Sequence, residues 1–157
     1  MRLLIILTTL TTGLSAGFFV TWSVSVIPGL NKLSNEAFIR SMQSINRYIQ
    51  NPVFFIIFFG PIVLLALVSY QLYNLGQLGT FKWILASLIL YVIGVFGVTV
   101  IGNVPLNNRL AKVDLESSET ELNTQRVAFE QPWNKYHYIR TVVSVLAFVC
   151  IAIAFTP

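Results

Sequence analysis

The sequence PVFFIIFFGPIVLLALVSYQLYNL, residues 52–75, is an unbroken run without a charged side chain. About 20 apolar residues are enough for a helix to cross the hydrocarbon core of a bilayer. Three further apolar runs lie at residues 3–30, 81–102 and 139–155. Because a backbone in lipid must satisfy its own hydrogen bonds, we expect each run to form a helix.

The composition places the chain among integral membrane proteins. Of its 157 residues, 55% are hydrophobic and 10% are charged, and the mean hydropathy is +0.74. Soluble domains carry about 25% charged residues. The net charge of +4 is typical of basic loops beside anionic lipid, so we expect no nucleic acid as a partner. The single cysteine, Cys150, cannot form an internal disulfide or a Cys–Cys metal site.

The predicted fold is all-α, a single membrane domain over residues 1–157, built as an up-down four-helix bundle. Pro132 favours a start of the fourth helix just after it, because proline is tolerated in a first helical turn. Arg2 and the small residues near Ala16 leave a signal peptide as the alternative for the first run, although that run continues well past Ala16. The spanning helices are expected at residues 3–30, 52–75, 81–102 and 133–155.

Two long connections, residues 31–51 and 103–132, must lie on one side of a bundle with an even number of helices. Most lysines and arginines of the chain fall within or beside these connections. The positive-inside rule therefore predicts cytoplasmic long loops and external termini, and we expect a multi-pass protein of the bacterial inner membrane.

Both long connections carry helix signals. Apolar residues recur at helical spacing from Phe38 to Ile49, which predicts an amphipathic helix with Asn35 as its N-cap. The sequence Ser118-Glu119-Thr120-Glu121 predicts a capping box and a second helix that runs toward Phe129.

Polar residues gather at the loop end of the predicted bundle. The sequence NVPLNNRL, residues 103–110, places three asparagines and an arginine where the third helix leaves the membrane. Trp133, His137 and Arg140 step at four and three residues, so they share one face of the fourth helix. The other candidates for a ligand site at this end are Trp22, Ser25, Asn46, Asn51, Asn103 and Asn107.

Each type of residue in this set also has a structural explanation. Asparagines at helix ends often cap helices or turns. Tryptophans at a membrane boundary often form an interfacial belt, and an arginine there can reach lipid phosphate. A single histidine is more often a satisfied structural residue than a catalyst. The coincidence of all of them at one end favours a site over any one of these explanations.

Strong enzyme signatures are missing from the sequence. It has no nucleotide-binding glycine loop, no CxxC and only one histidine, so a bis-histidine haem within the chain is excluded. Haem with another axial ligand, or a metal completed by a partner, stays open. No acidic residue lies inside a predicted spanning segment, which argues against a carboxylate proton relay.

Several short motifs are similar in order and spacing to those of one family. They are GFF at 17–19, SVSVIPGL at 23–30, FIRSMQSIN at 38–46, NP at 51–52, GNVPLNNRL at 102–110, Trp133, and Arg140 with Thr141. On these motifs the chain resembles the anthrone oxygenase-like family of small four-helix membrane proteins. The family tends to carry an asparagine three residues before the arginine, where this chain has His137.

The resemblance implies the oxidation of an anthrone to an anthraquinone by molecular oxygen, without flavin or haem. We therefore expect no cofactor, oxygen as co-substrate, and an apolar phenolic, anthrone- or quinol-like substrate. On this hypothesis His137 is the base or a proton relay. The candidate donors to the enolate oxygen are Arg140, Asn103, Asn107 and the Trp133 N–H. The apolar wall is expected from Phe18, Phe19, Trp22, Phe54, Phe55 and Phe58.

Two other functions stay open. One is a binding or assembly protein that holds a lipid, quinone or pigment. The other is a haem- or metal-dependent membrane oxidoreductase with ligands from a partner. The expected partners are the lipid bilayer and an apolar small molecule, with a homo-oligomer or a larger membrane complex left open.

Overall fold

A computed structural model describes residues 1–156, which form helices joined by short connections. Three of the elements are π-helical turns, labelled η, that continue neighbouring α-helices. The elements are α1 (Arg2–Thr21), η1 (Trp22–Val26), α2 (Ile27–Leu30), α3 (Asn35–Tyr48), α4 (Pro52–Asn74), α5 (Leu78–Leu90), η2 (Tyr91–Gly97), η3 (Thr99–Asn103), α6 (Val104–Leu110) and α7 (Glu119–Ala154).

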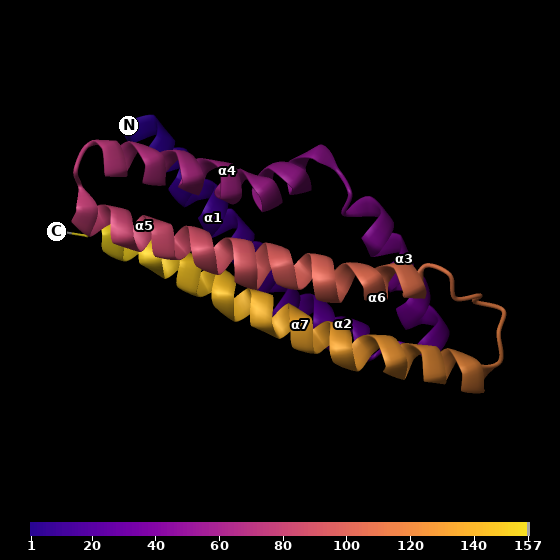
Figure 1. The fold of residues 1–157 in the computed structure, drawn as a ribbon. Coiled ribbons are helices and arrows are strands. Elements are labelled where there is room, and N and C mark those ends of the chain that lie inside the picture. The colour runs from indigo at the N-terminus through magenta and orange to yellow at the C-terminus, as the bar shows by residue number, and fades with distance from the viewer. Residues whose placement is uncertain (157) are drawn as a thin grey trace.

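Four helical runs are long and apolar enough to cross a membrane. They are Arg2–Leu30, Pro52–Asn74, Leu78–Leu110 and Glu119–Ala154. The predicted all-α, four-helix membrane bundle is therefore confirmed, and the chain is an integral membrane protein. Both termini and the turn from α4 to α5 lie at one end, while α3 and the connection from α6 to α7 lie at the other (Figure 1).

The third helix is longer than predicted. We expected it to end at residue 102, but it continues through η3 and α6 to Leu110. Leu110 is buried and Leu106 is partly buried against α3 and α7, and this packing stabilises the extra turns. Pro105 stands just after the junction of η3 with α6, inside this continuous helix.

The predicted break at Pro132 is wrong. We expected the fourth helix at residues 133–155 with a separate helix before it, but α7 runs unbroken from Glu119. Proline inside a helix removes one backbone hydrogen bond and costs about 3 kcal/mol. Phe129 and Trp133, on either side of Pro132, are buried in one apolar cluster, so packing holds both halves of the helix in line.

The caps at the loop end are partly as predicted. The Ser118 hydroxyl accepts from the Glu121 N–H at 3.3 Å, which confirms that part of the capping box. In contrast, α3 is capped by Ser34, whose hydroxyl accepts from the Ala37 N–H, and not by Asn35. The shift by one residue lets Asn35 donate instead to Glu119, across the interface with α7.

Arg126 joins the start of α3 to α7. Its guanidinium donates to Glu130, to the Leu33 carbonyl at 2.8 Å and to the Asn35 side chain at 3.3 Å, and it lies over the Phe38 ring. The Arg126 side chain is only 13% exposed. This contact network holds α3 over the loop end of the bundle.

We expect Arg126→Ala to lower the free energy of unfolding by about 2 kcal/mol, because it leaves charged and backbone hydrogen bonds unpaired. Thermal unfolding in detergent measures this loss. The matched control is Arg40→Ala, whose partner Glu36 is also an i,i+4 neighbour but whose own side chain is 63% exposed. Exposed pairs contribute under about 1 kcal/mol. Equal destabilisation by both variants would contradict the assignment.

Candidate functional site

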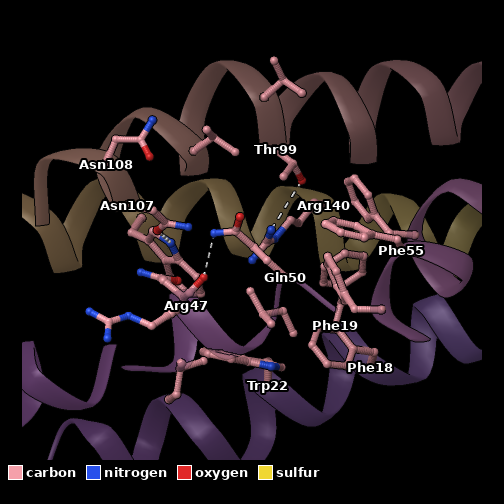
Figure 2. Close-up of a pocket in the computed structure, with 18 of the residues that line it drawn as sticks. Phe18, Phe19, Trp22, Arg47, Gln50, Phe55, Thr99, Asn107, Asn108 and Arg140 are labelled. Carbon is pink, nitrogen blue, oxygen red and sulfur yellow. Dashed lines mark hydrogen bonds between the residues drawn. The ribbon is translucent and has the colours of Figure 1, made fainter. Parts of the chain in front are cut away.

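A cavity of about 550 Å³ lies at the loop end of the four-helix bundle. Side chains from α1, η1, α3, α4, η2, η3, α6 and α7 line it. This volume is within the range of small-molecule sites. Figure 2 shows phenylalanines at one end of the cavity and amide side chains at the other.

The apolar end of the cavity is built from aromatic rings. Phe54 stacks on Phe58 with ring centroids 5.4 Å apart, and Phe96 packs against Phe58 at 6.0 Å. Hydrophobic and aromatic side chains of this kind favour a planar, apolar ligand. All six aromatic residues predicted as the wall line the cavity, namely Phe18, Phe19, Trp22, Phe54, Phe55 and Phe58.

Arg140 contributes a buried positive charge to the cavity wall. The residue is 9% exposed, and its guanidinium lies 4.8 Å from the centroid of the Phe19 ring and 5.2 Å from that of Trp133. It donates to the Thr99 hydroxyl at 3.4 Å, a contact drawn in Figure 2. Within residues 1–156, no carboxylate forms an ion pair with it. A buried cation without a counter-ion is unfavourable unless an anionic group approaches it.

His137 lies behind the cavity wall. Its Nδ1 accepts from Arg140 Nη2 at 3.1 Å and from Nε at 3.3 Å. Because a guanidinium only donates, Nδ1 carries the lone pair and Nε2 carries the proton, which it donates to the Ser23 hydroxyl at 2.9 Å. The His137 ring stacks on Trp133, with centroids 5.1 Å apart, and does not line the cavity. This position does not fit the predicted role as a base.

Asn107 faces the cavity from α6. Its Oδ1 accepts from the Trp133 indole N–H at 2.8 Å, so these two predicted site residues bind each other. The Trp133 N–H is therefore already used and does not point freely at a ligand. Trp22 packs on Trp133 with centroids 5.6 Å apart, which joins η1 to α7 at the same place.

Asn46 projects from α3 at the polar end of the cavity. Its Nδ2 is buried and has no hydrogen-bond partner. A buried donor without a partner costs about 1–3 kcal/mol, so a rotation of this amide toward a ligand acceptor would recover that energy. Asn46 and Arg140 thus both line the cavity, and both carry hydrogen-bond donors.

Three further predicted site residues, besides His137, lie outside the cavity lining. Asn51 caps α4, since its Oδ1 accepts from the Phe54 N–H at 3.0 Å. Asn103 is buried in the helix interface, where its Nδ2 donates to the Trp133 carbonyl at 3.2 Å. Ser25 is exposed on the outside of η1. The helix-cap explanation holds for Asn51, while Asn103 joins two helices through Nδ2 and its buried Oδ1 has no partner among the described residues.

Five polar lining residues were missing from the predicted site, namely Gln43, Arg47, Gln50, Thr99 and Asn108. Gln43 and Gln50 lie three residues before and four residues after Asn46, so helical spacing along α3 would have put them on the same face. Thr99 stands four residues before Asn103 in the third helix. Its hydroxyl is uncharged and common in membrane helices, and so it gave no separate signal.

The three π-helical turns lie next to this site. Trp22 begins η1, Phe96 belongs to η2 and Thr99 begins η3, and all three residues line the cavity. A π-turn carries an extra residue per turn, which re-aims the side chains that follow it, and such turns occur often at functional sites. They allow long, straight helices to present these residues inward.

A family model described as anthrone oxygenase matches residues 54–150, which is more than half of the chain. The chain belongs to the anthrone oxygenase family. Neither curated proteins nor solved structures gave a significant match. The family match covers α4 to most of α7, including Arg140, Asn107 and Trp133.

The walls contributed by α1, η1 and α3 precede the matched region of this anthrone oxygenase family member. Trp22 and Asn46 therefore belong to the site by geometry alone. Among residues 1–156, no three His, Cys, Asp or Glu side chains come together as a metal site. The titratable side chains that line the described cavity are the two arginines, Arg47 and Arg140.

Proposed function

We propose that this protein is a cofactor-independent oxygenase that acts on an apolar phenolic, anthrone- or quinol-like substrate within the membrane. The observation that carries the proposal is the buried Arg140 guanidinium, without a carboxylate partner, at the wall of an aromatic cavity. Family membership supports the same reaction class. As part of the proposal, the protein lies in the bacterial inner membrane with its long connections in the cytoplasm.

Arg140 would act on the oxygen of the substrate. An anthrone becomes electron-rich when the carbon between its two rings loses a proton and the charge moves to the ketone oxygen. A guanidinium that is already in place stabilises that oxyanion without reorganisation. The Asn46 amide offers a second donor on the same side, while the phenylalanines hold the flat rings.

The reaction balances without a further reductant. The enolate carbon transfers electrons to oxygen and forms a C–O bond, which gives a hydroperoxide after protonation. Loss of the second hydrogen from that carbon, with cleavage of the O–O bond, leaves the quinone carbonyl and releases one water. One anthrone and one oxygen molecule thus give one anthraquinone and one water.

The first proton leaves to water in this proposal. No carboxylate or imidazole lines the cavity among the described residues, and the polar end carries amides and Arg47. Arg140 lowers the free energy of the enolate, so water at the polar end of the cavity can accept the proton. The lack of a carboxylate or imidazole among the described lining residues also favours the second candidate function, a protein that binds a quinone or phenol without turnover.

Oxygen consumption tests the proposal. Purified protein in lipid nanodiscs is mixed with an anthrone, and oxygen uptake and anthraquinone formation are followed after subtraction of spontaneous oxidation. We expect equal amounts of oxygen consumed and quinone formed, with no Soret band and no stoichiometric metal. Anthrone binding without uptake would instead establish the binding protein. Activity that follows haem or metal content would establish the haem- or metal-dependent oxidoreductase.

A further inference from the structure

The cavity wall reaches the outer surface of the bundle at an apolar rim. Phe55 and Phe59 of α4, Val100 of η3 and Val104 of α6 all line the cavity, and they are 42%, 43%, 47% and 40% exposed. A lining residue with this exposure borders an opening. All four side chains are apolar and lie on membrane-spanning helices.

The helices on either side of this rim diverge. The substantial contacts of α4 are with α1, α5 and η2, and no comparable contact joins α4 to η3 or α6. In Figure 1 α4 separates from the third helix toward the end that carries α3. The opening is therefore a lateral one, between two spanning helices.

The depth of the opening places it beside hydrocarbon. Phe59 stands seven residues after the start of α4, which is about 10 Å along the helix at 1.5 Å per residue. The hydrocarbon core is about 30 Å thick, so a rim about 10 Å from the start of α4 faces the third of the core that is nearest the loop end. The polar lining residues Asn46, Arg47, Gln50 and Asn108 form a polar rim on α3, the residues that follow it, and α6, and Asn108 stands one helical turn beyond Val104, toward the loops.

From this arrangement we infer that the ligand enters the cavity from the bilayer, between α4 and the third helix, as a planar molecule dissolved in the lipid. Its rings pass the apolar rim, and its oxygens come to rest against Arg140 and Asn46. The inference rests on the proposed function only in taking this ligand to be the substrate. It predicts that the membrane concentration of the ligand, and not its aqueous concentration, sets the rate of binding.

Larger side chains at the rim test the route. We expect Val100→Phe/Val104→Phe to slow the association of an anthraquinone with nanodisc-embedded protein roughly tenfold or more, since binding now needs the rim to open. Quenching of Trp22 and Trp133 fluorescence reports binding without any turnover. The matched control is Ile93→Phe/Ile101→Phe on the same helix, where both residues are exposed at 68% and 78% and neither lines the cavity.

A variant at the polar rim separates the two routes. Asn108→Phe should slow association far less than Val100→Phe/Val104→Phe, because Asn108 stands one helical turn beyond Val104, toward the loops. Slowing by Asn108→Phe with normal rates in Val100→Phe/Val104→Phe would overturn the inference and establish access from water. If the double variant does not fold, Asn108→Phe and the dependence on lipid-phase concentration still decide. Binding from the bilayer without oxygen uptake would leave this route intact and count against the proposed reaction alone.

Discussion

Replacing Arg140 with methionine is expected to lower kcat for anthrone oxidation by about 10²–10³, the usual effect of losing one donor to a developing oxyanion. Methionine keeps most of the length and apolar surface of the side chain, so the wall of the cavity keeps its shape. The lost groups are the charge and the N–H donors that face the substrate. Initial rates of oxygen uptake in nanodiscs measure the effect.

The thermal stability of Arg140→Met should not fall together with its activity. Arg140 is buried with no carboxylate partner among the described residues, so its removal relieves a desolvation cost. We therefore expect the melting temperature of Arg140→Met to be equal to or above that of the wild type. Arg140→Lys keeps the charge but loses the planar guanidinium that binds both Thr99 and His137. Its rate should lie between those of the wild type and Arg140→Met. An inactive variant that is also unstable would show that Arg140 is structural.

The parts of the fold set by local apolar patterns were predictable. The four spanning runs and the aromatic wall follow from sequence because long apolar segments have one stable form in lipid. The break at Pro132 was predicted wrongly because the local rule for proline ignores Phe129 and Trp133, whose burial stabilises the helix through it. Tertiary packing outweighed a local cost of about 3 kcal/mol.

The individual roles of the polar residues were harder to predict. Asn51 and Asn107 both stand near helix termini, yet Asn51 binds the N–H of its own helix and Asn107 binds Trp133, 26 residues away. The nearer of the two hydroxyls beside His137 Nε2, that of Ser23, is 114 residues distant in the chain. Rules based on spacing along one helix do not predict contacts between residues this far apart in the sequence. The sequence could indicate the end of the bundle that holds the site, but not which side chains face the cavity.

His137→Leu is expected to lower kcat roughly 10- to 100-fold, with a smaller change in KM, because a misaligned group loses much of its effect on a transition state. The Arg140 guanidinium binds the His137 Nδ1 through two nitrogens. Leucine has no acceptor, so the guanidinium would turn away from its present position. His137 acts here as a positioning residue, and steady-state kinetics of oxygen uptake measure the loss.

His137→Asn is the variant that separates positioning from acid–base chemistry. The asparagine carbonyl can accept from Arg140, but its amide cannot take up a proton near neutral pH. Positioning therefore predicts that His137→Asn recovers most of the activity lost in His137→Leu. Equal loss in both variants would restore the imidazole as the base, and it would require the ring to leave Trp133 and reach the cavity. Ser23→Ala adds a check, because it removes one of the two hydroxyls beside Nε2 and leaves Thr141 at 3.2 Å, so it should reduce the rate less than His137→Leu.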